Sequence, residues 1–253
     1  MKGPDKTNGD IFLSVVAPAY NEEENIEEVI RNWEKVLEKC EHATEIVIGN
    51  DGSTDRTKEI LEQLMGEFPN LRAVHSKDNS GYGDALFKAI YASRGQYVVT
   101  IDSDGQFVLS DYLPLLQECL KNNYDAVTGY RMGKKDTFLR VLADRTLNVI
   151  VRVLFGLKYK DTNCALKLIK GDIIRKMTIE ARFYPTPTEI LLRLKEQGAR
   201  IGEVGVHHKE RIGGQSHLKL IRTGWDMFLF LIYMRLKLFL KRKRIINDFS
   251  ISL

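Results

Sequence analysis

In the stretch Tyr97-Val98-Val99-Thr100-Ile101-Asp102-Ser103-Asp104-Gly105-Gln106, an apolar run passes directly into a polar turn. The near-continuous apolar character of residues 97–101 is typical of a strand that is covered on both faces of a parallel sheet. In open sheets of this kind, ligands bind at the carboxyl ends of the strands. The stretch therefore predicts an α/β fold with a polar site directly after this strand.

The same alternation extends outward from this stretch. We expect strands over 11–17, 45–49 and 71–75, and helices with apolar periodicity over 26–37, 60–68 and 85–92. Beyond these, we expect extended segments over 125–129, 164–169 and 201–207, and helices over 136–154 and 188–197. Strands that alternate with helices in this way predict a Rossmann-like, mostly parallel central sheet flanked by helices.

The chain shows no internal repeat and no linker rich in Pro, Gly or Ser, which predicts one principal domain over 11–220. Residues 1–10 are polar and lack the apolar run of a signal peptide, so we expect a disordered leader there. Residues 221–253 form an amphipathic, basic segment. The three cysteines have neither zinc-site nor disulfide-framework spacing, which makes a reducing compartment the default.

The positive charge of the chain is concentrated near one end. The sequence has 38 Lys and Arg against 34 Asp and Glu, a formal net charge of +4. Six basic residues and no acidic ones lie between Arg235 and Arg244, so the rest of the chain carries a net charge of −2. A nucleic-acid module would spread basic and aromatic residues over its fold. We therefore expect no nucleic-acid partner.

The basic patch closes an apolar segment. Of the 16 residues from Trp225 to Leu240, 13 are apolar, and Lys241-Arg242-Lys243-Arg244 follows them. A helix of this length spans about 24 Å, less than the ~30 Å hydrocarbon core of a bilayer. We therefore expect a helix in the membrane interface, and a peripheral protein at the cytoplasmic face. The alternative is a helix buried against the main domain or in a homo-oligomer, and a membrane-protein partner also stays open.

Polar turns follow the other predicted strands as well. Pro18-Ala19-Tyr20-Asn21-Glu22 follows the first strand and Asn50-Asp51-Gly52-Ser53 the second. Each turn alone is compatible with ordinary turn and helix-cap chemistry. Together with residues 102–106 they converge on one rim of the sheet, which indicates a binding site.

Two carboxylates in one of these turns predict a metal ion. Asp102 and Asp104 are two residues apart at the end of an extended segment, so they point the same way and repel each other. Mg²⁺ or Mn²⁺, bound by one or two carboxylates and substrate phosphates, resolves this repulsion. An EF-hand is excluded because Phe107 and Leu113 stand where its turn Gly and bidentate Glu belong.

Other nucleotide-binding motifs are missing. The sequence has no GxxxxGK[ST] phosphate loop, and the residues 81–86 match only part of a GxGxxG pattern. ATP hydrolysis and dinucleotide redox chemistry are therefore disfavoured. The segment 79–83 either lets its backbone approach a ligand or simply opens the third helix.

Four motifs, in this order, carry a family resemblance: Val15-Val16-Ala17-Pro18-Ala19-Tyr20-Asn21-Glu22, Asn50-Asp51-Gly52-Ser53-Thr54-Asp55, Asn79-Ser80-Gly81-Tyr82-Gly83-Asp84-Ala85 and Asp102-Ser103-Asp104-Gly105-Gln106. They resemble family 2 glycosyltransferases of GT-A fold. Later motifs resemble the polyprenyl-phosphate sugar transferases of the dolichol-phosphate mannosyltransferase type: Gly129-Tyr130-Arg131, Asp144-Arg145 with Asn148, residues 161–167, and Arg211-Ile212-Gly213-Gly214-Gln215-Ser216. The resemblance implies a nucleotide half over about 11–129 and an acceptor half over about 130–220.

The resemblance also implies a role for each matching residue. Nucleotide-sugar binding falls to Pro18, Tyr20, Glu22, Asp51, Asp102 and Ser103, and metal binding to Asp102, Asp104 and Gln106. The implied catalytic residues are Asp104, Arg131 and Arg211. The implied ligands of the acceptor phosphate are Arg131, Arg145, Ser216 and His217. Three positions depart from the family pattern: Asn50 replaces an Asp, Lys167 an Arg and His217 a Lys. The departures leave the sugar and the exact anion contacts open and do not affect the metal pair.

The implied activity is metal-dependent, inverting transfer of a hexose from a nucleotide sugar to dolichyl or polyprenyl phosphate. Mannose is the first expectation, with glucose and N-acetylglucosamine open. A lipid phosphate is already an anion, so this reaction needs no strong general base. One alternative is transfer to a sugar or protein hydroxyl, which needs a base such as Glu189; the structural interpretation of Glu189 is an acidic residue in the first turn of a helix. A non-catalytic membrane scaffold is the other alternative.

Overall fold

The computed structural model describes residues 10–132, 138–209 and 220–242. The described strands are β1 (Leu13–Ala19), β2 (Thr44–Asn50), β3 (Leu71–His75), β4 (Tyr97–Thr100), β5 (Ala126–Met132), β6 (Lys167–Lys170) and β7 (Ile201–His207). The described helices are α1 (Ile26–Leu37), α2 (Thr57–Glu67), α3 (Tyr82–Ala92), α4 (Tyr112–Asn122), α5 (Phe138–Phe155), α6 (Gly171–Ile174), α7 (Thr186–Glu196) and α8 (Leu220–Arg242), with a 3₁₀ turn over Leu109–Asp111.

The strands form one seven-stranded sheet with the order β3-β2-β1-β4-β6-β5-β7. The predicted α/β class and mostly parallel sheet are therefore confirmed. β6 is the exception, because it runs antiparallel to β4 and β5, with Val99 opposite Leu168. The sequence predicted an extended segment over 164–169, but its apolar pattern carries no information about strand direction.

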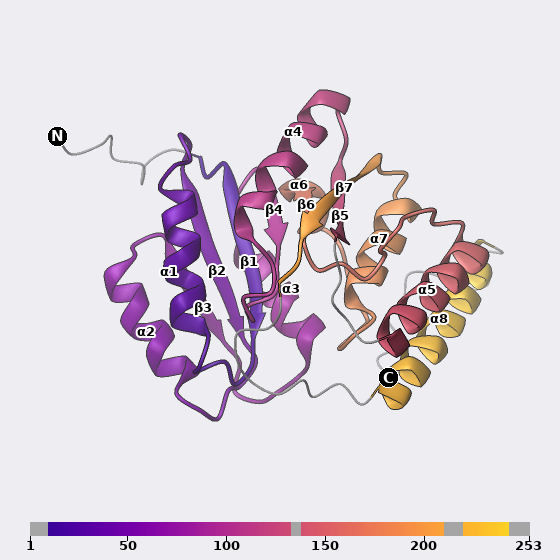
Figure 1. The fold of residues 1–253 in the computed structure, drawn as a ribbon, viewed down its shortest axis with the longest axis horizontal. Helices are drawn as coiled ribbons and strands as arrows, with labels where there is room; N and C mark the ends of the chain where they lie inside the picture. The colour runs from indigo at the N-terminus through magenta and orange to yellow at the C-terminus, as the bar shows by residue number, and fades with distance from the viewer. Residues whose placement is uncertain (1–9, 133–137, 210–219, 243–253) are drawn as a thin grey trace.

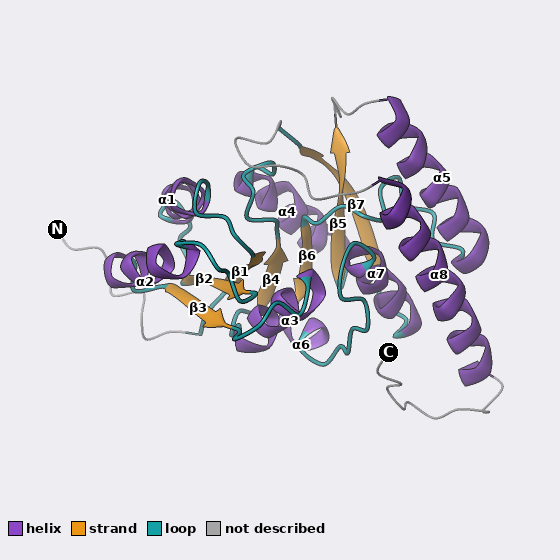
Figure 2. Ribbon diagram, turned by 90° about the horizontal axis from the view of Figure 1, so that it is seen from below, coloured by secondary structure: helices purple, strands orange, loops and turns teal. Residues whose placement is uncertain are grey.

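Helices cover both faces of the sheet (Figure 1). Consecutive strand residues point to opposite faces, and in β1 both Val15 and Val16 are fully buried. Val15 packs in a core with α1, α2 and α4, and Val16 in a second core with α3, α6 and α7. Figure 2 shows α1 and α4 on one side of the sheet and α3 and α6 on the other. This two-sided burial explains the apolar runs of the central strands.

α5 and α8 lie side by side at one end of the molecule in both views (Figures 1 and 2). Four residues of α8, spaced by three or four positions, are buried against the body of the protein: Met227, Leu231, Met234 and Leu238. The predicted packing of this segment on the main domain is therefore present on one face of the helix. Among the described helices, none is both long and apolar enough to cross a membrane.

Some expectations lie outside these elements. Residues 1–9 of the expected leader fall outside the described residues, as do the whole motif from Arg211 to Ser216 and His217 after it. The division into a nucleotide half and an acceptor half stays a prediction. α3 begins at Tyr82, three residues earlier than its apolar periodicity indicated, because Gly81 adopts φ +105° and turns the chain directly into the helix.

Candidate active site

The polar turns lie where β1, β2 and β4 end, at the lower edge of the sheet in Figure 1. The backbone N–H of Asp51 donates to the carbonyl of Ala19 at 2.9 Å, and the N–H of Ile101 donates to Val16 at 3.1 Å. The three strand ends are therefore held together by backbone hydrogen bonds. We call the turns 18–22, 51–55 and 101–106 the acidic rim.

The first two turns of the rim are interlocked. The backbone N–H of Asn21 donates to Oγ of Ser53 at 3.0 Å, and Oδ1 of Asn21 accepts from the N–H of Thr54 at 2.8 Å. The N–H of Glu22 donates to Oγ1 of Thr57 at 2.8 Å. Tyr20 stands exposed beside this interlock.

Asp51 uses both of its carboxylate oxygens within the protein. Oδ1 accepts from the N–H of Ser80 at 2.9 Å and Oδ2 from the N–H of Gly81 at 2.8 Å. Burial raises the pKa of Asp51, and the two backbone donors oppose that rise. In this arrangement the Asp51 side chain fixes the start of α3. Its role in nucleotide-sugar binding stays a prediction.

Of the two interpretations that were open for the segment 79–83, the structure shows that it opens α3. Its backbone N–H groups donate to the Asp51 side chain, and its approach to a ligand stays a prediction. A Cβ at Gly83 would lie 1.9 Å from the carbonyl oxygen of Ala181. The N–H of Gly83 donates to the carbonyl of Arg182 at 2.8 Å. Glycine is therefore required where α3 meets the segment 178–183.

The acidic pair of the rim is held by its neighbours. The hydroxyl of Tyr82 donates to Oδ1 of Asp102 at 2.8 Å, and Oδ1 of Asp104 accepts from the N–H of Gln106 at 3.0 Å. Between them, Ser103 is buried and its hydroxyl donates to the carbonyl of Pro18 at 2.7 Å. Ser103 thus joins the β4 turn to the β1 turn, and its hydroxyl proton is directed at the backbone.

The pKa of Asp102 is raised, as the repulsion predicted between Asp102 and Asp104 requires. Desolvation by the surrounding protein, and then the charge of Asp104, raise the pKa of Asp102 to about 7. The Tyr82 hydroxyl and the more distant charges of Arg131 and Lys167 act in the opposite direction. A cation at this pair would favour the ionised form of both carboxylates.

The donor set suits a metal ion that is shared with a substrate. In the part of the chain that the structure describes, no three His, Cys, Asp or Glu side chains gather as a metal cluster. The site offers two carboxylates and the amide of Gln106, whose Nε2 donates to the carbonyl of Lys209 at 3.3 Å. Mg²⁺ commonly takes one or two carboxylates and completes its shell with water and phosphate oxygens. The residues present fit such an ion.

Arg131 is fixed by an ion pair. Its Nε and Nη2 donate to the two oxygens of Asp161 at 2.6 and 2.9 Å, and both side chains are largely buried. Behind this pair, Lys167 is fully buried and its ammonium group donates to the carbonyl of Cys164. Burial lowers the pKa of Lys167 to about 8.

The structure describes only one of the other predicted phosphate ligands. Arg145 is exposed on α5, while Arg211, Ser216 and His217 lie outside the described residues. Their roles stay predictions. The rim therefore contains the predicted donor-side residues, and Arg131 is the predicted acceptor-side residue whose contacts are described.

Glu189 is unsuited to act as a base. It is fully buried, and its carboxylate accepts from the N–H groups of Ala181 and Glu180 at 2.7 and 3.0 Å and from Arg193 at 2.9 Å. Burial raises the pKa of Glu189, and these donors oppose that rise. The structural interpretation of Glu189 is confirmed, so the hydroxyl-acceptor alternative loses its candidate base.

Tyr82 is the site residue that sequence reasoning missed. Its motif was noted for its glycines. Nothing in a single sequence reveals that this tyrosine on α3 reaches the carboxylate of Asp102, which follows β4. The available signal was its position, because the residue lies in the first turn of a helix at the rim.

Residues 14–181 match the model of glycosyl transferase family 2, and this range includes the whole acidic rim. The chain belongs to glycosyl transferase family 2. It is a glycosyltransferase, as its sequence motifs predicted.

Relatives of this family 2 glycosyltransferase act on lipid phosphates according to their names. It is 26% identical to a dolichyl-phosphate beta-glucosyltransferase of Trichomonas vaginalis, over 92% of this chain and 77% of that protein. It is 28% identical to a dodecaprenyl-phosphate galacturonate synthase of Rhizobium johnstonii, over 94% of this chain and 71% of that protein.

A solved structure supports the fold of this family 2 glycosyltransferase. Glucosyl-3-phosphoglycerate synthase of Mycobacterium tuberculosis, solved with Mn²⁺, UDP and glucosyl-3-phosphoglycerate, superposes with a TM-score of 0.68. The two chains are 20% identical, and the match covers 89% of this chain and 80% of that one. The likeness shows a shared GT-A fold.

Proposed function

We propose that this family 2 glycosyltransferase moves a hexose from a nucleotide sugar to the phosphate of a polyprenyl or dolichyl lipid, with a divalent metal ion. The observation that supports this proposal most strongly is the carboxylate pair Asp102 and Asp104 after β4, in which Asp102 accepts a hydrogen bond from Tyr82. The names of the relatives, which specify dolichyl and dodecaprenyl phosphates, support the acceptor class.

The rim supplies the donor side of this reaction. The exposed ring of Tyr20 would stack on the nucleobase beside the interlocked turns. The donor diphosphate would lie over Asp102, Asp104 and Gln106, which would hold Mg²⁺ or Mn²⁺. When bound, such an ion offsets the negative charge that develops on the departing diphosphate.

The acceptor chemistry places few demands on the protein. An oxygen of the lipid phosphate forms a bond to the anomeric carbon, and the bond from that carbon to the nucleoside diphosphate breaks with inversion. The phosphate is already an anion, so no proton has to be removed from it, in agreement with the burial of Glu189. Arg131, oriented by Asp161, would direct its guanidinium toward the phosphates.

The sugar is the least constrained part of the proposal. The family motifs place mannose first, whereas the two relatives carry glucose and galacturonate in their names. A donor panel should therefore contain UDP-glucose, UDP-galacturonate and UDP-N-acetylglucosamine as well as GDP-mannose.

A membrane surface is the proposed partner of α5 and α8. Opposite its buried stripe, α8 exposes large apolar side chains, and α5 adds two more: Trp225, Phe228, Leu229, Ile232, Leu236, Phe239, Val149 and Val153. We call these residues the outer apolar face. Exposed apolar patches of this kind mark sites of protein or membrane contact, and the basic residues that end α8 suit anionic headgroups at the cytoplasmic side.

Vesicle binding tests the membrane proposal. Leu236→Glu in α8 should reduce co-sedimentation with vesicles that contain anionic lipid, while Leu120→Glu, an exposed apolar residue of α4, should not. Equal sedimentation of both variants and the wild type would contradict it.

Transfer itself is tested with the donor panel, undecaprenyl phosphate and Mg²⁺ or Mn²⁺, and the lipid product is identified by mass spectrometry. The proposal predicts a lipid phosphohexose from at least one donor and none after chelation of the metal. A protein that binds vesicles but transfers no sugar from any donor would instead be a membrane scaffold.

A further inference from the structure

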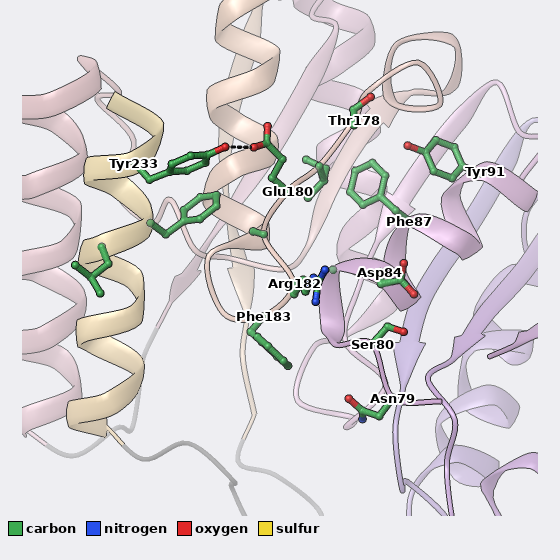
Figure 3. Close-up of a pocket in the computed structure, with 15 residues that line it drawn as sticks. Asn79, Ser80, Asp84, Phe87, Tyr91, Thr178, Glu180, Arg182, Phe183 and Tyr233 are labelled. Atoms are coloured by element: carbon green, nitrogen blue, oxygen red, sulfur yellow. Dashed lines mark hydrogen bonds between the residues drawn. The ribbon is translucent and has the colours of Figure 1, made fainter. Parts of the chain in front are cut away.

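A groove lies between α3 and α8, with the segment 178–183 as its floor (Figure 3). Its volume is about 840 Å³, within the range of about 300–1,000 Å³ that is common for small-molecule sites. Its walls are mainly apolar, with side chains from all three elements: Phe87, Ile179, Phe183, Leu229, Phe230 and Tyr233. Nothing in the sequence pattern indicated this groove.

Several of these side chains are exposed although they are large and apolar. Phe183 is 61% exposed, Tyr91 52% and Leu229 49%. In Figure 3, Tyr233 lies on one side of the groove and Phe87 and Tyr91 on the other, with Phe183 between them. An apolar ligand between them would remove this surface from water, at about 25 cal/mol per Å² of apolar area.

The groove begins next to the acidic rim. Ser80 lines the groove, and its backbone N–H is the donor to Asp51. Two residues further, Tyr82 reaches Asp102, while Gly83 again lines the groove. The first turn of α3 therefore separates the groove from the rim.

Polar contacts fix the width of the groove. Oε2 of Glu180 accepts from the hydroxyl of Tyr233 at 2.6 Å, and Oε1 accepts from Nζ of Lys237 at 2.5 Å, which fastens α8 to the floor. On the other wall, the hydroxyl of Tyr91 donates to the carbonyl of Met177 at 2.7 Å. Hydrogen bonds within the fold therefore hold both walls of the groove in place.

The charges around the groove are unbalanced. Asp84 pairs with Lys88, and Glu180 with Lys237. Arg182 is exposed and makes no ion pair with any residue that the structure describes. In Figure 3 it lies beside the start of α3, close to Ser80 and Asp84. Among the described residues, the groove therefore combines apolar walls with a cation at its rim end, Arg182, that forms no ion pair, and this combination complements an anionic amphiphile.

We propose that this groove binds the first isoprenyl units of the lipid phosphate acceptor, with the phosphate end directed toward the rim and Arg182 contributing attraction. This inference rests on the proposed function. Leu229 belongs both to the outer apolar face and to the groove. The hydrocarbon chain can therefore pass from a membrane into the groove without crossing a polar surface.

A photo-crosslinking experiment locates the chain directly. Geranylgeranyl phosphate with a diazirine in its terminal unit is irradiated with the full-length protein, without any sugar donor, and labelled peptides are mapped by mass spectrometry. Labels within residues 178–183 or 229–233 are expected, and excess unlabelled geranylgeranyl phosphate should suppress them. Labels that fall only elsewhere, or that resist competition, would overturn the proposal.

A chain-length comparison in detergent-free solution separates the groove from the reaction. Leu229→Asp should lower kcat/KM for geranylgeranyl phosphate about tenfold, the effect of losing burial of one or two methylene groups. It should leave kcat/KM for dimethylallyl phosphate unchanged. Leu120→Asp is the control, because Leu120 is an exposed apolar residue of α4 that belongs neither to the groove nor to the outer apolar face, and both values should stay at the wild-type level.

Phe183→Asp, which changes an exposed position of the floor, repeats the test if Leu229→Asp fails to fold. An unchanged ratio between the long and the short acceptor in a folded groove variant would overturn the inference while the proposed function stands. A wild-type protein that transfers sugar to neither phosphate would contradict the proposed function instead.

Discussion

The hydroxyl of Tyr82, at the start of α3, donates a hydrogen bond of 2.8 Å to Oδ1 of Asp102, at the end of β4. Asp51 fixes the same turn of α3 from β2, and the carbonyl of Arg182 fixes it from the segment before α7. Three parts of the chain that are distant in sequence therefore hold one carboxylate of the acidic pair in position.

Tyr82→Phe should weaken binding of Mn²⁺ together with the nucleotide. A hydrogen bond to a charged group contributes about 1.5–3 kcal/mol, so we expect roughly a tenfold or larger rise in the dissociation constant. Isothermal titration of Mn²⁺ in the presence of UDP or GDP measures this. Tyr91→Phe is the control, because Tyr91 lies at the other end of α3 and its hydroxyl donates to the carbonyl of Met177. Equal effects of the two variants would contradict a specific role for Tyr82.

The two-point contact of the Arg131 guanidinium with Asp161 should contribute more to catalysis than the positive charge of Arg131 alone. Arg131→Lys keeps the charge but loses the two-point contact with Asp161. We expect kcat/KM for the lipid phosphate to fall at least tenfold, with donor affinity much less affected. Arg31→Lys changes a similar two-point pair with Glu67 on the protein surface and should leave kcat/KM unaltered. A wild-type value in Arg131→Lys would exclude the fork from the reaction.

The attachment of α8 should depend on pH through Glu180. Burial raises the pKa of Glu180, but the ammonium of Lys237 and the hydroxyl of Tyr233 outweigh burial and hold it below its ordinary value. Because the folded-state pKa is depressed, this stabilisation is present above the unfolded pKa of ~4.3 and is lost as the pH falls through the folded value.

Glu180→Gln should accordingly speed hydrogen exchange of α8 amides at neutral pH. Breaking a largely buried ion pair costs about 3 kcal/mol, and the difference from the wild type should shrink as the pH is lowered toward the folded-state pKa. Glu62→Gln, in an exposed pair with Lys58, serves as the reference substitution. A difference that stays constant at all pH values would refute the ionic attachment.

Two glycines should respond to alanine in opposite directions. Gly83→Ala places a Cβ 1.9 Å from the carbonyl oxygen of Ala181, so backbone must move and stability should fall by about 2 kcal/mol or more. Gly66 lies in α2 with no atom within 4 Å of a new Cβ, and Gly66→Ala should stabilise by roughly 0.5–1 kcal/mol. Urea unfolding of both variants measures this contrast, and a stabilising Gly83→Ala would show that α3 is not pinned there.

The sequence was sufficient for features that local pattern controls. Apolar runs and helical periodicity predicted the strands and most of the helices, although α4 and the short α6 were not among the expected elements. The turns after β1, β2 and β4 predicted the rim, because the parallel strands force those turns to one edge. The direction of β6 was not predictable, since a short apolar run such as 164–169 fits either orientation. The partners of Tyr82, Glu180 and Glu189 were equally inaccessible, because each contact joins elements whose spacing depends on tertiary packing.

The two interpretations of the C-terminal helix were not exclusive. Met227 and Leu231 are buried on the main domain, whereas Ile232 and Leu236 are exposed. A count of apolar residues in the sequence could not separate these faces, because the segment is apolar almost all round.

The most direct measurement is transfer of hexose to undecaprenyl phosphate by the wild type, Asp104→Ala and Asp172→Ala, with product mass determined at matched protein concentration. Asp104 belongs to the acidic pair, whereas Asp172 is exposed on α6, away from the acidic rim. The account predicts a lipid phosphohexose from the wild type and Asp172→Ala, and a loss of at least about a hundredfold in Asp104→Ala. Undiminished transfer by Asp104→Ala would contradict it.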